Sequence, residues 1–293
     1  MPGDLHSHST FSDGSVPIGR LPLMASRLGI GTLAVSDHDT LLSVRYAYDH
    51  PVQEGVRLIP ATELTGYDFA RKHRVHLLCY WPDPEDEGMR AHCDLMRQRR
   101  NECCLQSARE LEAMYPQFRT EQALEYCKDS GVLYKCDLMR ALQHLGLSDG
   151  NIYGETYHYL FGWEPRGVVL HSPEYPPVEQ VLDMAHKAGA VVVLAHPTVY
   201  KSMPLVRELA AAGKIDGIEV DHPRNSPADR AECIELCRKY GLIPLGGSDF
   251  HGANHKVPHP LGTCLTADES LARLEELAAA RRHVRCRTDQ DIG

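Results

Sequence analysis

The sequence predicts an α/β protein in which helices surround a parallel sheet that closes into a barrel. Apolar runs alternate with amphipathic stretches along much of the 293 residues, as expected for repeated strand and helix units. Most apolar runs are also followed directly by a short polar segment. Because the carboxyl ends of the strands of a β/α barrel converge on one face, side chains from distant parts of the chain would meet there.

Strands and helices are expected from the start of the chain. An extended opening segment precedes a helix that Pro17 begins and that Gly29 or Gly31 ends. The next predicted strands cover residues 32–36, 56–61 and 74–80. Their polar groups are Asp37-His38-Asp39-Thr40 after the first, Thr62-Glu63-Leu64-Thr65 after the second, and His76 within the third.

The character of the sequence changes between about residues 82 and 176. Helix-prone pieces over 90–114, 120–127 and 138–145 precede an aromatic-rich run over 153–163. We predict a small helical insertion over the mouth of the barrel, formed by residues 82–165, with residues 1–81 and 166–293 as the barrel. The basic stretch 97–100 is interpreted as a solvated helix face in preference to a phosphate contact.

Regular alternation resumes after the insertion. Helices are predicted over 178–188 and 205–212, from Ser226-Pro227 through Cys237, and over 271–281. Strands are predicted over 190–195, 217–220 and 242–245. The polar segments that follow these three strands are His196-Pro197, Asp221-His222-Pro223-Arg224-Asn225 and Gly246-Gly247-Ser248-Asp249-Phe250-His251-Gly252.

Composition excludes some functions. The formal charge of -9 argues against binding to duplex nucleic acid, which depends on a basic surface. No apolar run is long enough to cross a bilayer, and the N-terminus has no basic stretch followed by an apolar core, so we expect a cytoplasmic protein without a membrane partner. The oligomeric state is left open.

Cysteine and histidine usage also guides the interpretation. The 10 cysteines include an adjacent pair and a pair one helical turn apart but no Cys-x-x-Cys pair, so reduced, buried thiols are expected rather than disulfides or a structural zinc site. Histidine is abundant, with 17 copies against 5 Phe and 2 Trp. Histidine ligates transition metals and transfers protons near neutral pH.

Imidazole and carboxylate groups recur at the strand ends. In the extended opening segment His6 and His8 point to the same face and can bind one metal ion together, although such a pair alone is more often a surface feature. Similar groups lie on or just past apolar runs throughout the chain. They are His6, His8, His38, Glu63, His76, His196, Asp249 and His251. This coincidence predicts a metal site.

The donor types suggest a chemistry. Imidazoles and carboxylates without thiolates suit Mn, Fe or Zn better than Ca or Mg. Eight or nine donors are too many for one ion, and a carboxylate such as Glu63 can bridge two ions. Such a cluster lowers the pKa of bound water and neutralises phosphoryl oxygens. Hydrolysis of a phosphate ester is the reaction that needs both effects.

These motifs, in this order, resemble the polymerase and histidinol phosphatase (PHP) family. The resemblance rests on Asp4-Leu5-His6-Ser7-His8, Asp13-Gly14, Ser36-Asp37-His38-Asp39, Glu63, His76, Ala195-His196-Pro197 and Ser248-Asp249-Phe250-His251. It implies a distorted (β/α)7 barrel with a small helical insertion domain. It also implies a metal-dependent phosphoesterase with two or three divalent ions (Mn, Fe or Zn) and a hydroxide bridging two of them as nucleophile.

The resemblance assigns ligands to three ions. It implies that His6, His8, Glu63 and Asp249 hold the first ion, that Glu63, His76 and His196 hold the second, and that Asp13, His38 and His251 surround the third. In some relatives a histidine takes the place of Asp13. Capping of the following turn by Asp13 is the alternative.

Substrate contacts are less specific in the sequence. Arg224 could bind a phosphate outside the reacting centre, and His222 could protonate the leaving alcohol, or both could be ordinary rim residues. Lys135 lies where nucleotide-hydrolysing relatives tend to show a Gly-Arg-Pro-His run. This departure leaves Lys135 as a possible phosphate contact and puts a nucleoside bisphosphate substrate in doubt.

Three functional hypotheses follow. The first is a phosphoesterase for a monoester or cyclic diester of a small phosphorylated sugar or nucleotide. The second is a nucleoside 3′,5′-bisphosphate 3′-phosphatase or an exonuclease for short oligonucleotides, which stacking on Tyr153, Tyr157 or Trp163 would favour. The third is a non-catalytic metal-binding module, which predicts missing ligands and a polymerase partner domain.

Overall fold

Seven strands follow one another around the sheet in the computed structural model, which describes residues 2–255 and 257–291. Their order is β1-β2-β4-β5-β6-β7-β8, and the short strand β3 pairs with β4 off this path. The strands are β1 Gly3–Asp4, β2 Thr32–Val35, β3 Val52–Gln53, β4 Val56–Asp68, β5 His73–Tyr80, β6 Val191–Leu194, β7 Gly217–Asp221 and β8 Ile243–Gly246.

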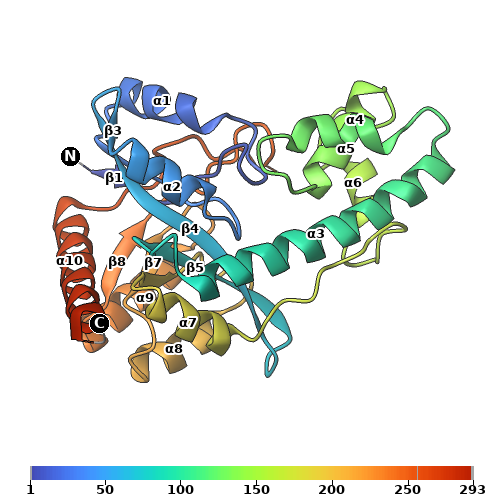
Figure 1. Ribbon diagram of the computed structural model, residues 1–293. Coiled ribbons are helices and arrows are strands. Elements are labelled where there is room, and N and C mark those ends of the chain that lie inside the picture. The colour runs from blue at the N-terminus through green and yellow to red at the C-terminus, as the bar shows by residue number, and fades with distance from the viewer. Residues whose placement is uncertain (1, 256, 292–293) are drawn as a thin grey trace.

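Helices surround this sheet and form a separate group beside it (Figure 1). The α-helices are α1 Leu21–Arg27, α2 Leu42–Asp49, α3 Glu87–Met114, α4 Thr120–Leu124, α5 Lys135–His144, α6 Glu155–Phe161, α7 Val178–Lys187, α8 Met203–Ala211, α9 Pro227–Tyr240 and α10 Asp268–Asp291. Short 3-10 turns are η1 Ile18–Arg20 and η2 Glu125–Cys127. Helix α2 was not predicted, and α10 is longer than the predicted 271–281. No described helix has both the length and the apolar character needed to span a membrane.

The prediction of a parallel sheet is wrong for two strands. The short strand β3 runs antiparallel to β4. β5 runs antiparallel to both of its neighbours, β4 and β6. The connection between β4 and β5 is only residues 69–72, too short for the helical crossover that a parallel pair requires. β4 is also longer than predicted, so Glu63 lies inside the strand rather than beyond its end.

The segments after β1 and after β8 nearly close the barrel. Leu5 donates its backbone N–H to the carbonyl of Gly246, Asp249 donates to His6, and His8 donates to Phe250 at 2.8 Å. The two motif segments from opposite ends of the chain therefore lie side by side. This pairing brings the His6 and His8 pair next to Asp249.

Side-chain alternation explains which residues reach the barrel interior. On β4 and β5, Ile59 and Ala61 share one buried cluster with Leu78 and Tyr80, whereas Leu64 and Leu77 pack outward against α7. Successive side chains point to opposite faces, so Glu63 and His76 belong to the inward set. Glu63 and His76 occupy the next inward-facing positions on their strands, beside the apolar residues that fill the barrel.

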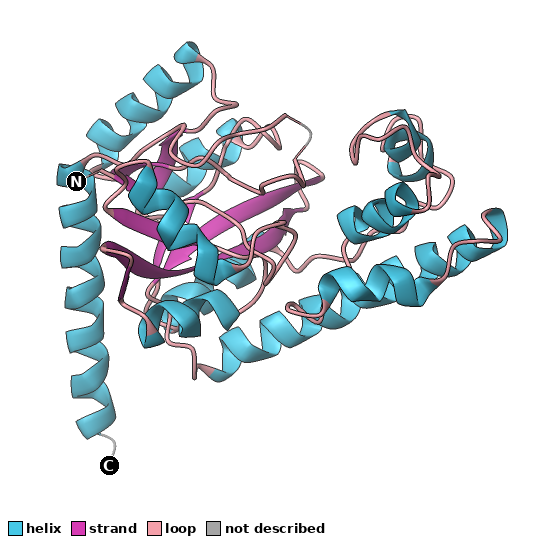
Figure 2. Ribbon diagram, turned by 90° about the horizontal axis from the view of Figure 1, so that it is seen from above, coloured by secondary structure: helices cyan, strands magenta, loops and turns pink. Residues whose placement is uncertain are grey.

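The helices between β5 and β6 have an apolar core of their own. This cluster runs from Cys104 on α3 through Phe118 and Leu138 to Val169. The first turn of α3 instead packs Met89 against the barrel cluster, so α3 links the two. Figure 2 shows α3 leading from the sheet to the smaller helices. The division at 82–165 stays a prediction, and a separate core supports it.

Candidate metal centre

Four donor atoms meet at one point near the closure of the sheet. His6 Nε2 and His8 Nε2 are 3.1 Å apart. Each is 3.3 Å from Glu63 Oε2, and they are 3.4 and 3.3 Å from Asp249 Oδ1. Donors bonded tetrahedrally to one ion at about 2.0–2.1 Å would be separated by roughly 3.3 Å. These four side chains therefore have the spacing of a metal-binding set.

Glu63 faces further imidazoles with both of its oxygens. Glu63 Oε1 is 2.9 Å from both His76 Nδ1 and His196 Nε2. Glu63 Oε2 is also 3.1 Å from His38 Nδ1. One buried carboxylate thus touches five imidazoles, which is the position a bridging ligand would need.

A third group of donors surrounds Asp13. His251 Nε2 lies 3.3 Å from Asp13 Oδ1, and His38 Nε2 lies 3.9 Å from Asp13 Oδ2. His8 joins them, because its ring centroid is 4.1 Å from that of His251. All nine residues predicted as ligands therefore come together. His8 lies at the boundary between the first and third groups, which the sequence did not suggest.

The charge state of these groups fits cation binding. Burial raises the pKa of Glu63, but His76, His6 and His38 lower it more, so the carboxyl stays ionised. Burial lowers the pKa of His8, yet Asp249 and Glu63 bring it up to about 10. Protonated imidazole thus balances the carboxylates, and a bound divalent ion would replace such protons. Burial lowers the pKa of His38 to about 3, leaving that ring neutral.

Unpaired buried atoms give an independent test of fit. Glu63 Oε2, His8 Nδ1, His38 Nδ1 and His196 Nδ1 are buried without a hydrogen-bond partner. Buried polar atoms are nearly always paired, so such a concentration needs an explanation. Glu63 Oε2 points at three imidazole nitrogens in ligand geometry. The donor set therefore fits divalent metal ions.

Backbone strain accompanies the loops that carry these ligands. Asp39, His196 and Asp249 have φ values of 46°, 24° and 52°. Non-glycine residues rarely adopt this left-handed region, which costs about 1–3 kcal/mol and is concentrated at functional sites. Asp39 is held there by hydrogen bonds from the backbone N–H and hydroxyl of Thr65, at 2.8 and 2.9 Å.

Comparison with known proteins agrees with this geometry. Residues 4–187 match the PHP domain. The chain belongs to the PHP family. A phosphoribosyl 1,2-cyclic phosphate 1,2-diphosphodiesterase from Eggerthella lenta is 34% identical over 257 residues, covering 87% of this chain and 96% of the relative. The 5′-3′ exoribonuclease Rnm of Escherichia coli is 28% identical, covering 85% and 84%. A 3′,5′-nucleoside bisphosphate phosphatase from Chromobacterium violaceum is 26% identical, covering 85% and 86%.

A solved structure has the same fold. A protein from Bifidobacterium adolescentis, provisionally named a metal-dependent phosphoesterase, superposes with a TM-score of 0.83 and 25% identity, covering 94% of this chain and 96% of the other. This PHP protein is therefore a metal-dependent phosphoric ester hydrolase.

Glu219 is a residue of this PHP site that the sequence analysis missed. It is fully buried on β7, accepts the Nδ1–H of His6 at 2.8 Å and accepts the backbone N–H of His196 at 2.6 Å. A carboxylate behind a histidine fixes the ring so that the other nitrogen faces the metal. The feature of the sequence that could have identified Glu219 is a glutamate inside an otherwise apolar strand.

We expect Glu219→Gln to weaken metal binding at the first donor set. The amide keeps the size of the side chain but removes the charge that holds His6, and loss of such a partner typically costs about 10–100-fold in affinity. Competition with a fluorescent chelator would measure the change. Glu235→Gln, on the exposed side of α9, is the matched control. Equal affinities for both variants would mean that Glu219 only fills space.

The three residues predicted around the substrate lie in different settings. His222 is buried, its Nδ1 accepts the backbone N–H of Arg224 at 3.2 Å, and its Nε2 is 3.4 Å from Asp249 Oδ2. The Arg224 side chain is exposed. Lys135 begins α5 and is half-buried among insertion residues. The roles of all three stay predictions.

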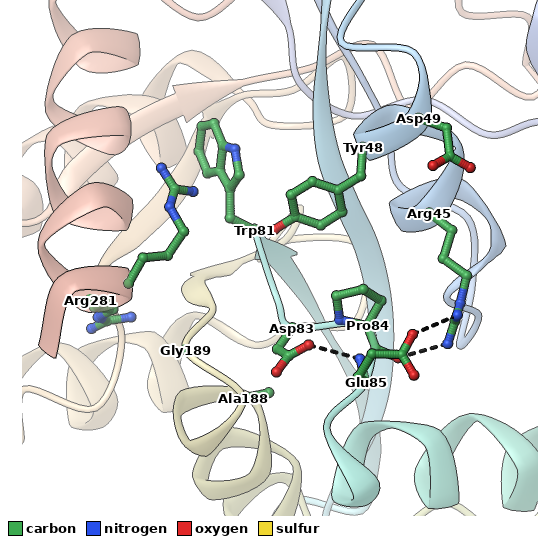
Figure 3. Close-up of a pocket in the computed structure, with 11 residues that line it drawn as sticks. Arg45, Tyr48, Asp49, Trp81, Asp83, Pro84, Glu85, Ala188, Gly189 and Arg281 are labelled. Carbon is green, nitrogen blue, oxygen red and sulfur yellow. Dashed lines mark hydrogen bonds and ion pairs between the residues drawn. The ribbon is translucent and has the colours of Figure 1, made fainter. Parts of the chain in front are cut away.

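A large cavity of this PHP protein lies elsewhere. It measures about 570 Å³ and is lined by residues that include Tyr48, Trp81, Gly189 and Arg281 (Figure 3). Gly189 precedes β6, whereas His196 follows it, so the cavity is at the amino end of that strand and the donors are at the carboxyl end. None of its lining residues is a predicted ligand.

Proposed function

We propose that this PHP protein hydrolyses a phosphate ester of a small phosphorylated sugar, with a cyclic diester as the favoured substrate. The observation that carries the proposal is the convergence of overlapping donor groups, two of which contain Glu63: His6, Glu63 and His196 form one, and His38, Glu63 and His76 form the other. The Eggerthella lenta relative, whose name specifies a cyclic phosphate of a phosphorylated pentose, supports the choice of substrate.

Each donor group has a role in this proposal. His6, His8, Glu63 and Asp249 would hold the first ion, Glu63, His76 and His196 the second, and Asp13, His38 and His251 the third. When bound, such ions lower the pKa of water and neutralise charge on the phosphoryl oxygens. Glu63 supplies one oxygen to each of the first two sets, which fixes their separation. Glu219 orients His6.

We propose that His222 donates a proton to the leaving alcohol. Its Nδ1 accepts a backbone N–H, so the ring nitrogen that can donate a proton is Nε2, which lies 3.4 Å from Asp249 Oδ2. Because the ring is buried beside Asp249, it also orients that carboxylate. Arg224, on the exposed side of the same loop, is proposed to contact a phosphate that does not react.

A second candidate is cleavage of a nucleoside bisphosphate or of short oligonucleotides, as the names of the two other relatives suggest. Tyr153 and Tyr157 pack against the insertion core, which leaves them less free to stack on a base. Trp163 is 69% exposed and is the better candidate for stacking. The exposure of Trp163 is therefore the observation that favours the second candidate function.

A product screen with added Mn²⁺ tests the proposal. Candidate substrates are a pentose 5-phosphate 1,2-cyclic phosphate, pentose bisphosphates, histidinol phosphate, nucleoside 3′,5′-bisphosphates and a short oligoribonucleotide. We expect selective ring opening of the cyclic sugar phosphate, detected by ³¹P NMR, with phosphate release from monoesters at least tenfold slower. Selective cleavage of the nucleotides would support the second candidate. Absence of turnover on every compound would favour the non-catalytic module.

A further inference from the structure

We infer that this protein binds one further divalent transition-metal ion, at Asp249, His255 and His259, beyond the three sets of donors described above. We call these three residues the fourth donor set. One carboxylate oxygen and one ring nitrogen from each histidine lie within 4.8 Å of one another. Both histidines belong to the connection between β8 and α10, and the sequence analysis assigned no role to either.

Asp249 has an oxygen to spare for a second ion. Its Oδ1 faces the two imidazoles of the first donor set, at 3.4 and 3.3 Å. Its Oδ2 instead faces His222 Nε2 at 3.4 Å and His255 Nε2 at 4.0 Å. Asp249 therefore has the arrangement already described for Glu63, with each carboxylate oxygen directed at a different group of donors.

His255 is oriented for metal binding by the backbone beside it. Its Nδ1 contacts the carbonyl of Val257 and, at 3.2 Å, the backbone N–H of the same residue. Metal-bound histidines typically donate their second ring N–H to such a carbonyl, which fixes the orientation of the ring. The nitrogen that faces Asp249 Oδ2 is consequently Nε2.

His259 provides an observation that is independent of these distances. The residue is only 9% exposed, and its Nδ1 has no hydrogen-bond partner among the described residues. Its ring centroid lies 4.3 Å from that of His255 and 6.1 Å from that of His222. A buried polar atom without a partner is rare and calls for a ligand that the protein itself does not supply. A metal ion shared with Asp249 and His255 would be such a ligand.

The donor types identify the class of ion. Two imidazoles and one carboxylate suit Zn²⁺ and other first-row transition ions better than Mg²⁺ or Ca²⁺. Three protein ligands leave a coordination position open, as in catalytic zinc sites. The separation of 4.0 Å between His255 Nε2 and Asp249 Oδ2 exceeds the roughly 3.3 Å expected for two donors on one tetrahedral ion. The fourth donor set should therefore bind more weakly than the first and fill last.

Occupation of the fourth donor set would affect the proposed reaction. Asp249 Oδ2 is the atom that His222 Nε2 faces, and His222 is the proposed proton donor to the leaving alcohol. An ion on Oδ2 would replace this contact and release His222 from its position. Excess Zn²⁺ is therefore expected to inhibit the enzyme. This consequence rests on the proposed function, whereas the ion site itself does not.

Counting of bound ions tests the fourth donor set without turnover. The full chain is dialysed against increasing concentrations of free Zn²⁺, and bound zinc is measured by elemental analysis. We expect His255→Ala to bind one ion fewer than the wild type at concentrations that saturate the wild type, with the weakest binding step lost. His50→Ala removes an exposed histidine after α2 and is the matched control. Equal zinc contents in His255→Ala and the wild type at every concentration would overturn the inference.

A second variant separates ligand loss from misfolding. His259→Gln keeps a side chain of similar length but removes the imidazole, so it should lose the same ion as His255→Ala. Circular dichroism and Tm of both variants without metal should match those of the wild type. His255 is half-buried, so His255→Ala is expected to fold even if the buried position 259 tolerates no change. If both variants fold and His259→Gln keeps the ion that His255→Ala loses, the set of three ligands is wrong.

Inhibition by zinc gives a second readout. The rate at excess Zn²⁺ is divided by the highest rate of the same variant, on whichever substrate the product screen identifies. We expect this ratio to fall about tenfold or more for the wild type, since a general acid contributes at least about 100-fold to rate, and to stay near one for His255→Ala. Equal inhibition of the two proteins would overturn the link to His222. If no substrate is cleaved, the proposed function fails, and the ion count still decides the fourth donor set.

Discussion

Glu63→Ala is expected to abolish turnover and to remove most of the bound metal. Both Glu63 oxygens face imidazoles of the donor sets at 2.9–3.3 Å, so the substitution removes one ligand from two sets at once. A lost catalytic metal site costs several kcal/mol of transition-state stabilisation, which corresponds to roughly 1,000-fold or more in kcat. Metal analysis of the purified variant and initial rates at saturating Mn²⁺ measure both effects.

Folding must be separated from chemistry in this experiment. Glu63→Gln is nearly isosteric and keeps the buried volume, so it should fold while still losing the anionic bridge. Glu235→Ala is the control for loss of a glutamate, because its side chain is 78% exposed on α9. If a folded Glu63→Gln variant retains near-normal metal content and rate, the bridging role of Glu63 is wrong.

Chelation of the metal is expected to destabilise the fold strongly and reversibly. The centre gathers the buried carboxylates of Glu63, Asp249 and Glu219 among imidazoles, and a divalent ion bound there stabilises the folded chain that supplies its ligands. An ion at 1,000 times its Kd contributes about 4 kcal/mol, on the order of 10 °C in Tm for a chain of this size. Calorimetry with EDTA, followed by stepwise return of Mn²⁺, measures the shift.

The Glu63→Ala variant supplies the comparison for chelation. Its Tm should respond little to EDTA, since it lacks the shared ligand. A wild-type Tm that is equal with and without Mn²⁺ would contradict the role of the donor sets in stability. Recovery of both Tm and activity at the same metal concentration would link the two effects to one site.

The sequence predicted the site best where the alternation of strands and helices and the position of polar residues at strand ends agreed. Eight imidazoles and carboxylates were identified because each lies on or just past an apolar run, Asp13 was implied by the family resemblance, and the fold brings all nine together. The start of α9 at Ser226-Pro227 was also predicted correctly, and Ser226 caps the helix by accepting the backbone N–H of Asp229. All nine cysteines whose side chains are described are free, as expected.

The sequence analysis failed where a residue acts across the fold. Glu219 and Arg100 have partners 213 and 61 residues away, and nothing in their local sequence identifies those partners. The antiparallel direction of β5 had a local signal, the short connection after Asp68, which the repeated β/α pattern obscured. Helix α2 was not predicted because the sequence has no helix-start signal there. Its N-cap residue, Leu41, makes no side-chain capping hydrogen bond.

The pairing of the segment after β1 with the segment after β8 also affects biosynthesis. His6 and Ser248 are in contact although 242 residues separate them. A ribosome adding about 5–20 residues per second needs roughly 12–48 s to travel that distance. Throughout this interval the emerging chain carries His6 and His8 without Asp249. The first donor set is therefore complete only after nearly the whole polypeptide has been translated.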